Sequence, residues 1–468
     1  MVRHLKHGGK RVLPTAKYTA DITCALKNAE DFPRVLFLTA AAFNKVTGGG
    51  VTFSNLFAGW PHERIATVHN DTVPVSTDVC SHYYKLGAGE IHKQGVLRHL
   101  MPVQKDGGVG NEQSTAARRS TLHTVARTMK KMLFGNAIPD VGQLTPELES
   151  WVAAYKPDVL YTILGTNAMM DLAKALCKRF DIPLVVHLMD DWPAVAYRGG
   201  LLSWFSRRRM QKSLQDLITV ADVRIGICED MAGEYTRRYG VPFMAYQNAV
   251  DTGKWQDYTK KDLAVGEQTR LLYIGSILPD AQLDALVDCC AAVARLRGDG
   301  MNVVLDIYSP SFYVQPYREK LVLDEGIRLH DAIANDEEVF RRLVEADILL
   351  LPVNFDSETV RYIKYSMPTK VPAYLFSGTP VLVYGPGETA QAIYAKNAGW
   401  GYVLSQRDQI RLAAAIRRLA TDRELREQLS CAARTAIFKH HDASTVRAGF
   451  QAVLCESVWN RASRTANR

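Results

Sequence analysis

Short, predominantly apolar runs alternate with longer amphipathic stretches through most of the chain. The runs have the length of strands and carry apolar residues on both faces, which is typical of parallel strands covered by helices on both sides. The clearest runs span 34–40, 158–164, 182–188, 223–228, 270–275, 302–308, 346–353 and 379–385. Helical periodicity follows several of them, over 168–179, 204–220 and 281–297. The pattern predicts an α/β protein built from doubly wound sheets.

A polar segment interrupts this alternation near the middle of the chain, and the length of 468 residues suits two domains. We therefore predict an N-terminal arm over 1–33, domains over 34–251 and 269–440, a linker over 252–268, and a last helical segment over 441–468 that packs back across the interface. Two such domains are expected to face one another. Ligands are then expected between them, at the carboxyl ends of the strands.

Composition narrows the class of protein without naming a function. Hydrophobic residues make up 47% and charged residues 23%, as in globular proteins, and the longest apolar runs are far too short to span a membrane. The first ten residues are basic but lack the apolar stretch of a signal peptide. The eight cysteines form no CxxC pair and no zinc-ligand spacing. We therefore expect a reducing compartment, the cytoplasm.

The net charge of +8 favours anionic partners, such as nucleotide phosphates or an acidic membrane face. Nucleic acid is not predicted, because the charge is spread and no recognition motif is present. The basic stretch 116–135, and Arg207, Arg208 and Arg209 beside two aromatic residues, fit the inner face of an anionic membrane that presents a lipid-linked acceptor. The alternative is an amphipathic helix packed on the first domain, with its basic face in solvent.

Three glycines, Gly48, Gly49 and Gly50, follow the first apolar run and precede a helical stretch from about Val51. Glycines at such a turn let an anion or a sugar oxygen approach the free backbone N–H groups. Their spacing is not GxGxxG, and no lysine follows to make a phosphate-binding Walker loop. They are therefore candidate donor-binding residues, with a purely structural turn as the alternative.

A second candidate site follows the run 346–353 and a loop. Ser366 or Thr369 is expected to cap a short helix that ends at Gly378, with Lys370 in its first turn. A cation in the first turn is repelled by the positive end of the helix dipole. This arrangement is explained if Lys370 and the helix N-terminus together bind a diphosphate. The alternative is a solvent-facing lysine.

A third cluster, His187, Asp190 and Asp191, lies at the end of the run 182–188. These are the candidate catalytic residues, because a histidine and two carboxylates at a strand end can orient an acceptor hydroxyl or bind the hydroxyls of a donor sugar. The alternative is a core histidine with a helix-capping aspartate. No third ligand follows at a recognisable spacing, so we predict no metal site.

Three segments resemble the glycosyltransferase family 4 group, which has the GT-B fold. They are 34–71, 187–193 (HLMDDWP) and 365–388 (YSMPTKVPAYLFSGTPVLVYGPGE), and the resemblance covers about residues 34–440. It implies two facing Rossmann-like domains, a nucleotide-sugar donor held mainly by the C-terminal one, and no metal or other cofactor. By the same resemblance, Lys370 and the backbone of residues 366–369 hold the donor diphosphate. Gly49 and Gly50 lie across the cleft, and His187 lies near the donor sugar.

The chain departs from this group at one motif. Many members carry Glu-x7-Glu, whose second glutamate usually holds the donor ribose, but Tyr365 and Ala373 stand at these positions. The expected basic pair after the run 270–275 is also not evident. Glu358 and Arg361, in the preceding loop, or Glu388 are the candidate replacements.

Together these patterns predict a metal-independent glycosyltransferase that moves a sugar from a nucleotide-sugar donor to a glycan or lipid-linked acceptor, in polysaccharide or glycoconjugate biosynthesis. The family resemblance implies a retaining mechanism, which can rely on the leaving phosphate, whereas inversion needs a base such as Asp190 or Asp191. One alternative is a nucleotide-sugar epimerase of the same fold, which turns over donor without acceptor. The other is a non-catalytic nucleotide-sugar or glycan-binding protein, which never consumes donor.

Overall fold

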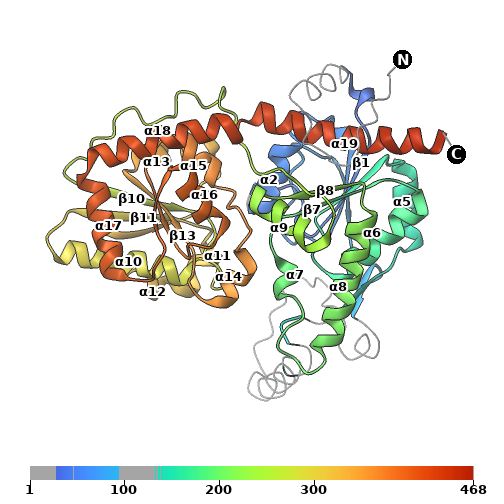
Figure 1. Ribbon diagram of the computed structural model, residues 1–468, viewed down its shortest axis with the longest axis horizontal. Coiled ribbons are helices and arrows are strands. Elements are labelled where there is room, and N and C mark those ends of the chain that lie inside the picture. Colours follow the sequence, from blue (N-terminus) through green and yellow to red (C-terminus); the bar gives the residue numbers. More distant parts are fainter. Residues whose placement is uncertain (1–27, 46, 94–131, 133–134, 138, 467–468) are drawn as a thin grey trace, which may run out of the picture.

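The computed structural model describes residues 28–45, 47–93, 132, 135–137 and 139–466. Most of the predicted arm 1–33, and all of the basic stretch 116–135 except residues 132 and 135, lie outside the described residues. Two α/β domains lie side by side, and a long C-terminal helix runs along the first of them (Figure 1).

The first domain is built on a parallel sheet in the order β3-β2-β1-β6-β7-β8-β9. Its strands are β1 (Val35–Thr39), β2 (Ile65–His69), β3 (His82–Lys85), β6 (Val159–Thr162), β7 (Leu184–Leu188), β8 (Val223–Gly226) and β9 (Met244–Ala245). Its helices are α2 (Gly48–Leu56), α5 (Pro146–Tyr155), α6 (Asn167–Phe180), α7 (Trp192–Val195), α8 (Ser203–Val220) and α9 (Glu229–Tyr239). A small antiparallel pair joins β4 (Ile91–Lys93) to β5 (Asp140–Gly142).

The second domain has a parallel sheet in the order β12-β11-β10-β13-β14-β15. Its strands are β10 (Thr269–Ile274), β11 (Val303–Tyr308), β12 (Ile327–His330), β13 (Ile348–Pro352), β14 (Val381–Tyr384) and β15 (Gly401–Leu404). Its helices are α10 (Leu283–Gly298), α11 (Ser311–Val314), α12 (Arg318–Leu321), α13 (Asp336–Glu345), α14 (Ser357–Ile363), α15 (Val371–Ser377), α16 (Ala390–Ala398), α17 (Gln409–Thr421) and α18 (Arg423–His440).

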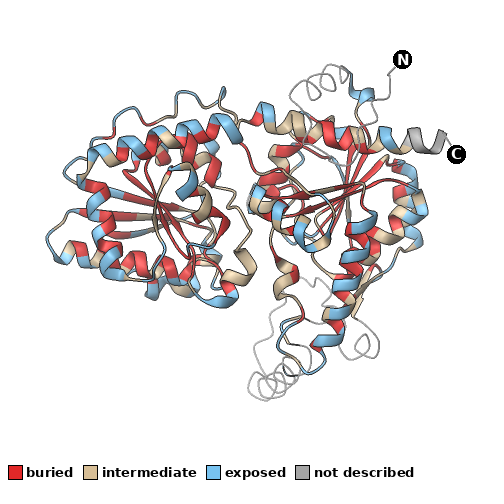
Figure 2. Ribbon diagram, viewed as in Figure 1, coloured by how far each residue is buried: buried red, intermediate tan, exposed pale blue. Residues whose placement is uncertain are grey.

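Alternation along the central strands explains why each sheet is covered on both faces. In β1, Val35 and Phe37 enter one apolar core, while Leu36 and Leu38 enter another on the opposite face. Successive side chains of a strand point to opposite faces, so a strand that is apolar at every position needs helices on both sides. Figure 2 shows the buried strands inside and the exposed residues on the outer sides of the helices. The predicted α/β doubly wound fold is therefore confirmed.

The chain crosses between the domains twice, and the two crossings are hydrogen-bonded to each other. Val250 N donates to His441 O at 2.9 Å, and Ala443 N donates to Val250 O at 2.9 Å. After this point α19 (Ala443–Ala466) returns along the first domain, where Phe450 and Leu454 join its core. Helices of the described residues include none with the length and hydropathy required to span a membrane.

Two helices differ from the sequence predictions: α2 begins earlier, and α14 was not predicted. Helix α2 begins at Gly48, because the Thr47 side chain accepts a hydrogen bond from Gly50 N, so the three glycines form its first turn rather than a preceding loop. Residues 357–363 are helix α14 and not a loop, since Asp356 accepts from the backbone N–H groups of Glu358 and Thr359. Glu358 and Arg361 therefore lie on a helix.

Candidate active site

The carboxyl ends of β1 and β10 face each other across the domain interface. In each sheet the strand order reverses beside one of these strands, between β1 and β6 and between β10 and β13. Such reversal points are where open α/β sheets bind ligands. The two sides meet directly, because Thr369 Oγ1 donates to Gly48 O at 3.1 Å and lies 3.3 Å from Thr52 Oγ1. The candidate site is built around this contact.

The three glycines have different surroundings. A Cβ on Gly48 would lie 2.9 Å from Thr369 Oγ1, so Gly48 is the one in contact with the other domain. A Cβ on Gly50 would lie 2.4 Å from the Asn44 side chain, which makes Gly50 necessary for packing within its own domain. Gly49 would meet only ordinary contacts at 3.5 Å. Of the three predicted donor-binding glycines, Gly48 alone is brought against the C-terminal domain.

Lys370 places a cation directly after Thr369, the residue that contacts the first domain. It is the N-cap of α15, and its Nζ lies 4.0 Å from the centroid of the Tyr273 ring at the end of β10. Gly275 has φ 139°, and a Cβ there would lie 2.6 Å from Nζ, so only glycine leaves room for the ammonium group. Lys370 forms no ion pair within the described residues. Burial lowers the pKa of Lys370 to about 7.

Helix α15 has no side-chain cap, so the expectation that Ser366 or Thr369 caps it is wrong. Both hydroxyls instead bond across the interface, where they have partners in the first domain. Thr369 reaches Gly48, and Ser366 Oγ donates to Asp190 Oδ1 at 2.8 Å.

Asp190 joins the end of β7 to the second domain. In addition to Ser366, Tyr362 OH donates to its Oδ2 at 3.3 Å. The residue is half-buried, and burial raises the pKa of its carboxyl group. Asp190 therefore faces the cleft between the domains with part of its surface free.

Asp191 has a different role. It is 2% exposed, its carboxylate accepts from both terminal nitrogens of Arg238 at 2.8 and 3.0 Å, and Tyr235 OH donates to it at 2.7 Å. These bonds occupy both oxygens and hold α9 against the end of β7. The alternative of a helix-capping aspartate is wrong for Asp191, because its side chain makes no cap hydrogen bond to α7 and is held by Arg238 and Tyr235 instead.

His187 lies beneath the cleft, in the apolar core of the first domain. The side chain is fully buried, its Nδ1 lies 2.6 Å from Tyr161 OH, and the ring of Phe53 packs against it. Burial lowers the pKa of His187 to about 3, so the imidazole is neutral. The core-histidine alternative describes this position, and the contact with a donor sugar stays a prediction.

The candidate replacements for the missing glutamates lie beside a separate cavity of about 550 Å³. Arg361, Lys364 and Glu388 line it, but Ser366, Thr369 and Lys370 do not. Glu358 is paired with Arg361 at 2.5 Å, and Glu388 with Lys364 at 3.2 Å. Glu358 and Arg361 are thus not brought together with the lysine of the predicted diphosphate site.

Two residues near the strand ends of the first domain were not identified from the sequence. Asn248, at the first crossing between the domains, accepts from Asn55 Nδ2 and donates to Thr369 O, both at 2.7 Å. Leu164, at the end of β6, has φ 30°, a conformation that L-residues rarely adopt and that often marks functional sites. Neither role has a local sequence pattern.

Comparison with protein-family models gives no match, and comparison with curated proteins gives none either. Solved structures are similar over most of the chain. Sucrose-phosphate synthase from Thermosynechococcus elongatus has 14% identity and a TM-score of 0.56, covering 88% of this chain and 96% of that one. Anabaena HepE, solved with UDP and glucose, has 12% identity and a TM-score of 0.54, with 89% and 97% covered.

WaaG, a glycosyltransferase involved in lipopolysaccharide biosynthesis, has 14% identity and a TM-score of 0.51, with 88% and 97% covered. The chain has the GT-B fold. At these identities the similarity establishes the architecture of the two domains, while the chemistry has to be argued from the side chains between them.

Proposed function

We propose that this GT-B chain is a glycosyltransferase, which moves a sugar from a nucleotide-sugar donor to a glycan or lipid-linked acceptor in polysaccharide or glycoconjugate biosynthesis. The observation that carries the proposal is the ammonium group of Lys370, which is enclosed at the end of β10, next to the interdomain residue Thr369, and has no carboxylate partner among the described residues. An enclosed, unpaired charge destabilises a protein, so its retention suggests an anionic ligand. A donor diphosphate is the anion that this fold suggests.

Lys370 has a direct role in the proposed chemistry. Transfer of the sugar leaves negative charge on the departing diphosphate, and a cation already fixed beside it stabilises the transition state without reorganisation. Gly275 and the backbone of residues 366–369 let the phosphates approach this cation. Metal independence is part of the proposal, because the lysine supplies the positive charge. In the described residues, no cluster of three or more histidines, cysteines or carboxylates is arranged to hold a metal ion.

A retaining mechanism is also part of the proposal. An inverting enzyme needs a carboxylate base, but Asp191 is occupied by Arg238 and Tyr235. The oxygens of Asp190 already accept hydrogen bonds from Ser366 and Tyr362, which occupies them with groups of the second domain. A retaining enzyme can use the leaving phosphate to take the proton of the acceptor hydroxyl. Asp190 then has the task of orienting that hydroxyl, together with Ser366.

The bonds of Asp191 and the burial of His187 also fit the second candidate, a nucleotide-sugar-binding protein without activity. The missing glutamates favour it too, because Tyr365 packs against the apolar core of the first domain and Ala373 carries no polar group. Both candidates need the same donor site. Consumption of the donor distinguishes them.

The test measures release of nucleoside diphosphate from a panel of nucleotide sugars, with and without glycan acceptors, for the natural protein and Lys370→Met. Acceptor-dependent release that is lost in Lys370→Met supports the transferase. The matched control is Lys364→Met on the neighbouring α14, which is expected to keep activity. Stabilisation by a nucleotide sugar without any turnover would establish the binding protein instead. Donor turnover without acceptor and without nucleotide release would indicate the epimerase.

A further inference from the structure

The end of the first domain that points away from α19 carries a cluster of exposed apolar side chains. Leu201, Leu202, Trp204 and Phe205, in the loop before α8 and in its first turn, have between 48% and 67% of their surface exposed. Met132, whose carbonyl accepts from Leu201 N, is 64% exposed as well. We call these five residues the apolar tip. Large apolar residues gathered in this way, rather than scattered singly, mark an interaction site.

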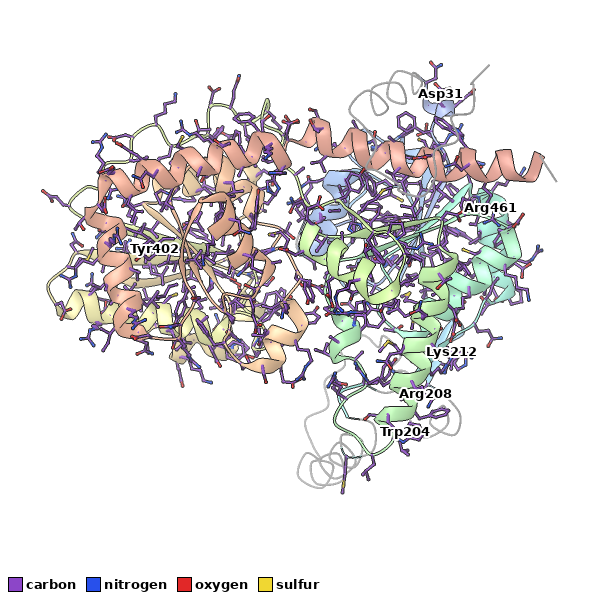
Figure 3. The ribbon with its side chains drawn as sticks, in the orientation of Figure 1. Asp31, Trp204, Arg208, Lys212, Tyr402 and Arg461 are labelled. Carbon is purple, nitrogen blue, oxygen red and sulfur yellow. The ribbon has the colours of Figure 1, made fainter. Side chains whose placement is uncertain are left out.

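Cations adjoin the apolar tip. Arg208 and Lys212 follow Trp204 at intervals of one helical turn, so the three side chains lie on one side of α8, as Figure 3 shows. Both cations are exposed, and neither forms a hydrogen bond or ion pair with any residue that the structure describes. Residues 192–215 contain five Lys or Arg residues and no Asp or Glu. The tip and its surroundings are therefore apolar and positively charged at once.

The backbone beneath the tip is held in place by hydrogen bonds. Arg207 Nη1 donates to Ala196 O at 2.8 Å, Arg198 Nε donates to Ala194 O at 2.7 Å, and Ser203 Oγ donates to Gly200 O at 2.6 Å. These bonds fix the loop that leads from α7 to α8. Arg207 thus has a structural partner, whereas Arg208, one position on, points its charge to solvent.

The tip is connected to the cleft by a short path. Helix α7 begins at Trp192, directly after Asp190 and Asp191, and it packs against α14 of the second domain. Figure 1 shows the chain running from α7, beside the domain interface, down to the loop before α8. A surface bound at the apolar tip would therefore be connected to Asp190 and Asp191 through helix α7 and the loop that follows it.

We propose that the apolar tip inserts into the surface of an anionic lipid bilayer, with Arg208 and Lys212 at the level of the headgroups. Aromatic side chains are buried at the boundary between the headgroups and the acyl chains, and adjacent cations are attracted to anionic lipids. A second copy of the chain is a poorer occupant. A symmetric pair would bring these unpaired cations of both copies together, which is repulsive.

The experiment is flotation of the full chain with vesicles of phosphatidylcholine, with and without phosphatidylglycerol. Binding is expected only to the anionic vesicles, and it should weaken as salt is added. Trp204→Ala/Phe205→Ala is expected to reduce the apparent affinity at least about tenfold, because two apolar side chains lose their burial. Arg208→Gln/Lys212→Gln is expected to reduce it roughly thirtyfold, from the attraction of two charges to an anionic surface.

Matched controls come from the second domain. Ile410→Ala/Phe438→Ala removes apolar groups that are 63% and 65% exposed, and Lys396→Gln/Lys439→Gln removes two exposed lysines. Both controls are expected to bind vesicles as the natural protein does. Equal loss in the controls, or anionic binding that survives the tip variants, would overturn the proposal. So would the absence of any binding to anionic vesicles by the full chain.

A second measurement reports on Trp204 itself. Quenching of tryptophan fluorescence by brominated lipid is expected in the natural protein and should be strongly reduced in Trp204→Phe, which keeps an aromatic ring for binding. Light scattering without lipid tests the self-association alternative. A dimer that dissociates in Trp204→Ala/Phe205→Ala would assign the tip to a second copy and refute the membrane role. None of these readouts uses a donor, so they stand or fall separately from the proposed transferase activity.

Discussion

Replacing Lys370 by methionine is expected to stabilise the unliganded protein and to abolish its response to nucleoside diphosphates. Methionine keeps an unbranched stem but removes the charge from the space beside Gly275 and the Tyr273 ring. A residue that is kept for function can lower the stability of the folded protein, and removing it then raises that stability.

The magnitude follows from three contributions. Enclosing an unpaired charge costs several kcal/mol in real proteins. The Tyr273 ring, 4.0 Å from Nζ, recovers about 0.5–2 kcal/mol of this as a cation–π contact. Because Lys370 is half-buried as a residue, we expect a net gain of only about 1–3 kcal/mol in Lys370→Met, which raises Tm by roughly 2–8 °C.

The pH dependence has a definite sign. The pKa of Lys370 is about 7 in the folded protein and 10.5 in the unfolded chain, so between these values the unfolded chain binds more protons. The free energy of unfolding of the natural protein therefore rises with pH in this window, relative to that of Lys370→Met. The advantage of the variant should be largest below pH 7 and shrink towards pH 10.5.

The assay is thermal unfolding with and without nucleoside diphosphates at several pH values. A ligand at about a hundred times its Kd should stabilise the natural protein by ~2.7 kcal/mol and leave Lys370→Met unchanged. Lys364→Met is the control, because its lysine is a half-exposed partner of Glu388, worth at most about 1 kcal/mol. A variant that melts below the natural protein and still responds to the ligand would refute the reasoning.

Three further experiments test the candidate site and its surroundings. Gly275→Ala should lower stability by about 1–3 kcal/mol in thermal unfolding and abolish nucleotide binding, since its backbone has φ 139° and its Cβ would collide with the ammonium group. Arg238→Met and Asp191→Asn, combined in a double-mutant cycle by urea unfolding, should show a coupling of about 2–4 kcal/mol, and a value near zero would contradict the buried pair. Gly48→Ala should weaken donor binding in calorimetry, and Thr369→Ala should restore it by removing the hydroxyl that the new Cβ meets at 2.9 Å. Without that rescue, Gly48 acts through something other than this contact.

Much of the fold followed from local patterns. The strands at the centre of both sheets are apolar on both faces, and this alone requires helices on either side. The first strand residues of each domain, Val35 and Thr269, lie within two residues of the predicted positions. Helix α14 was missed although its signal was local, since Asp356 is a standard N-cap before Ser357 and Glu358.

The site depended on contacts that no local pattern contains. Asp190 and Asp191 are neighbours in the sequence and looked equivalent, yet one faces the second domain and the other is enclosed by Arg238, which lies 47 residues away. Thr369 bonds to Gly48 across 321 residues of chain. The hydrophobic pattern predicts which helix or strand contains a residue. Its side-chain partners, however, depend on how that element packs against others.

The sequence by itself thus determined the two parallel sheets, the break between them and the strand ends where polar residues gather, because each depends on the hydrophobic pattern within a few turns of chain. Only the tertiary structure decided which of those polar residues are accessible. It enclosed His187, paired Asp191, left Asp190 in the cleft and placed Lys370 over Tyr273. The reason is physical: burial and partner choice depend on groups that other elements bring from far along the chain, from the same domain for His187 and Asp191 and from the second domain for Asp190.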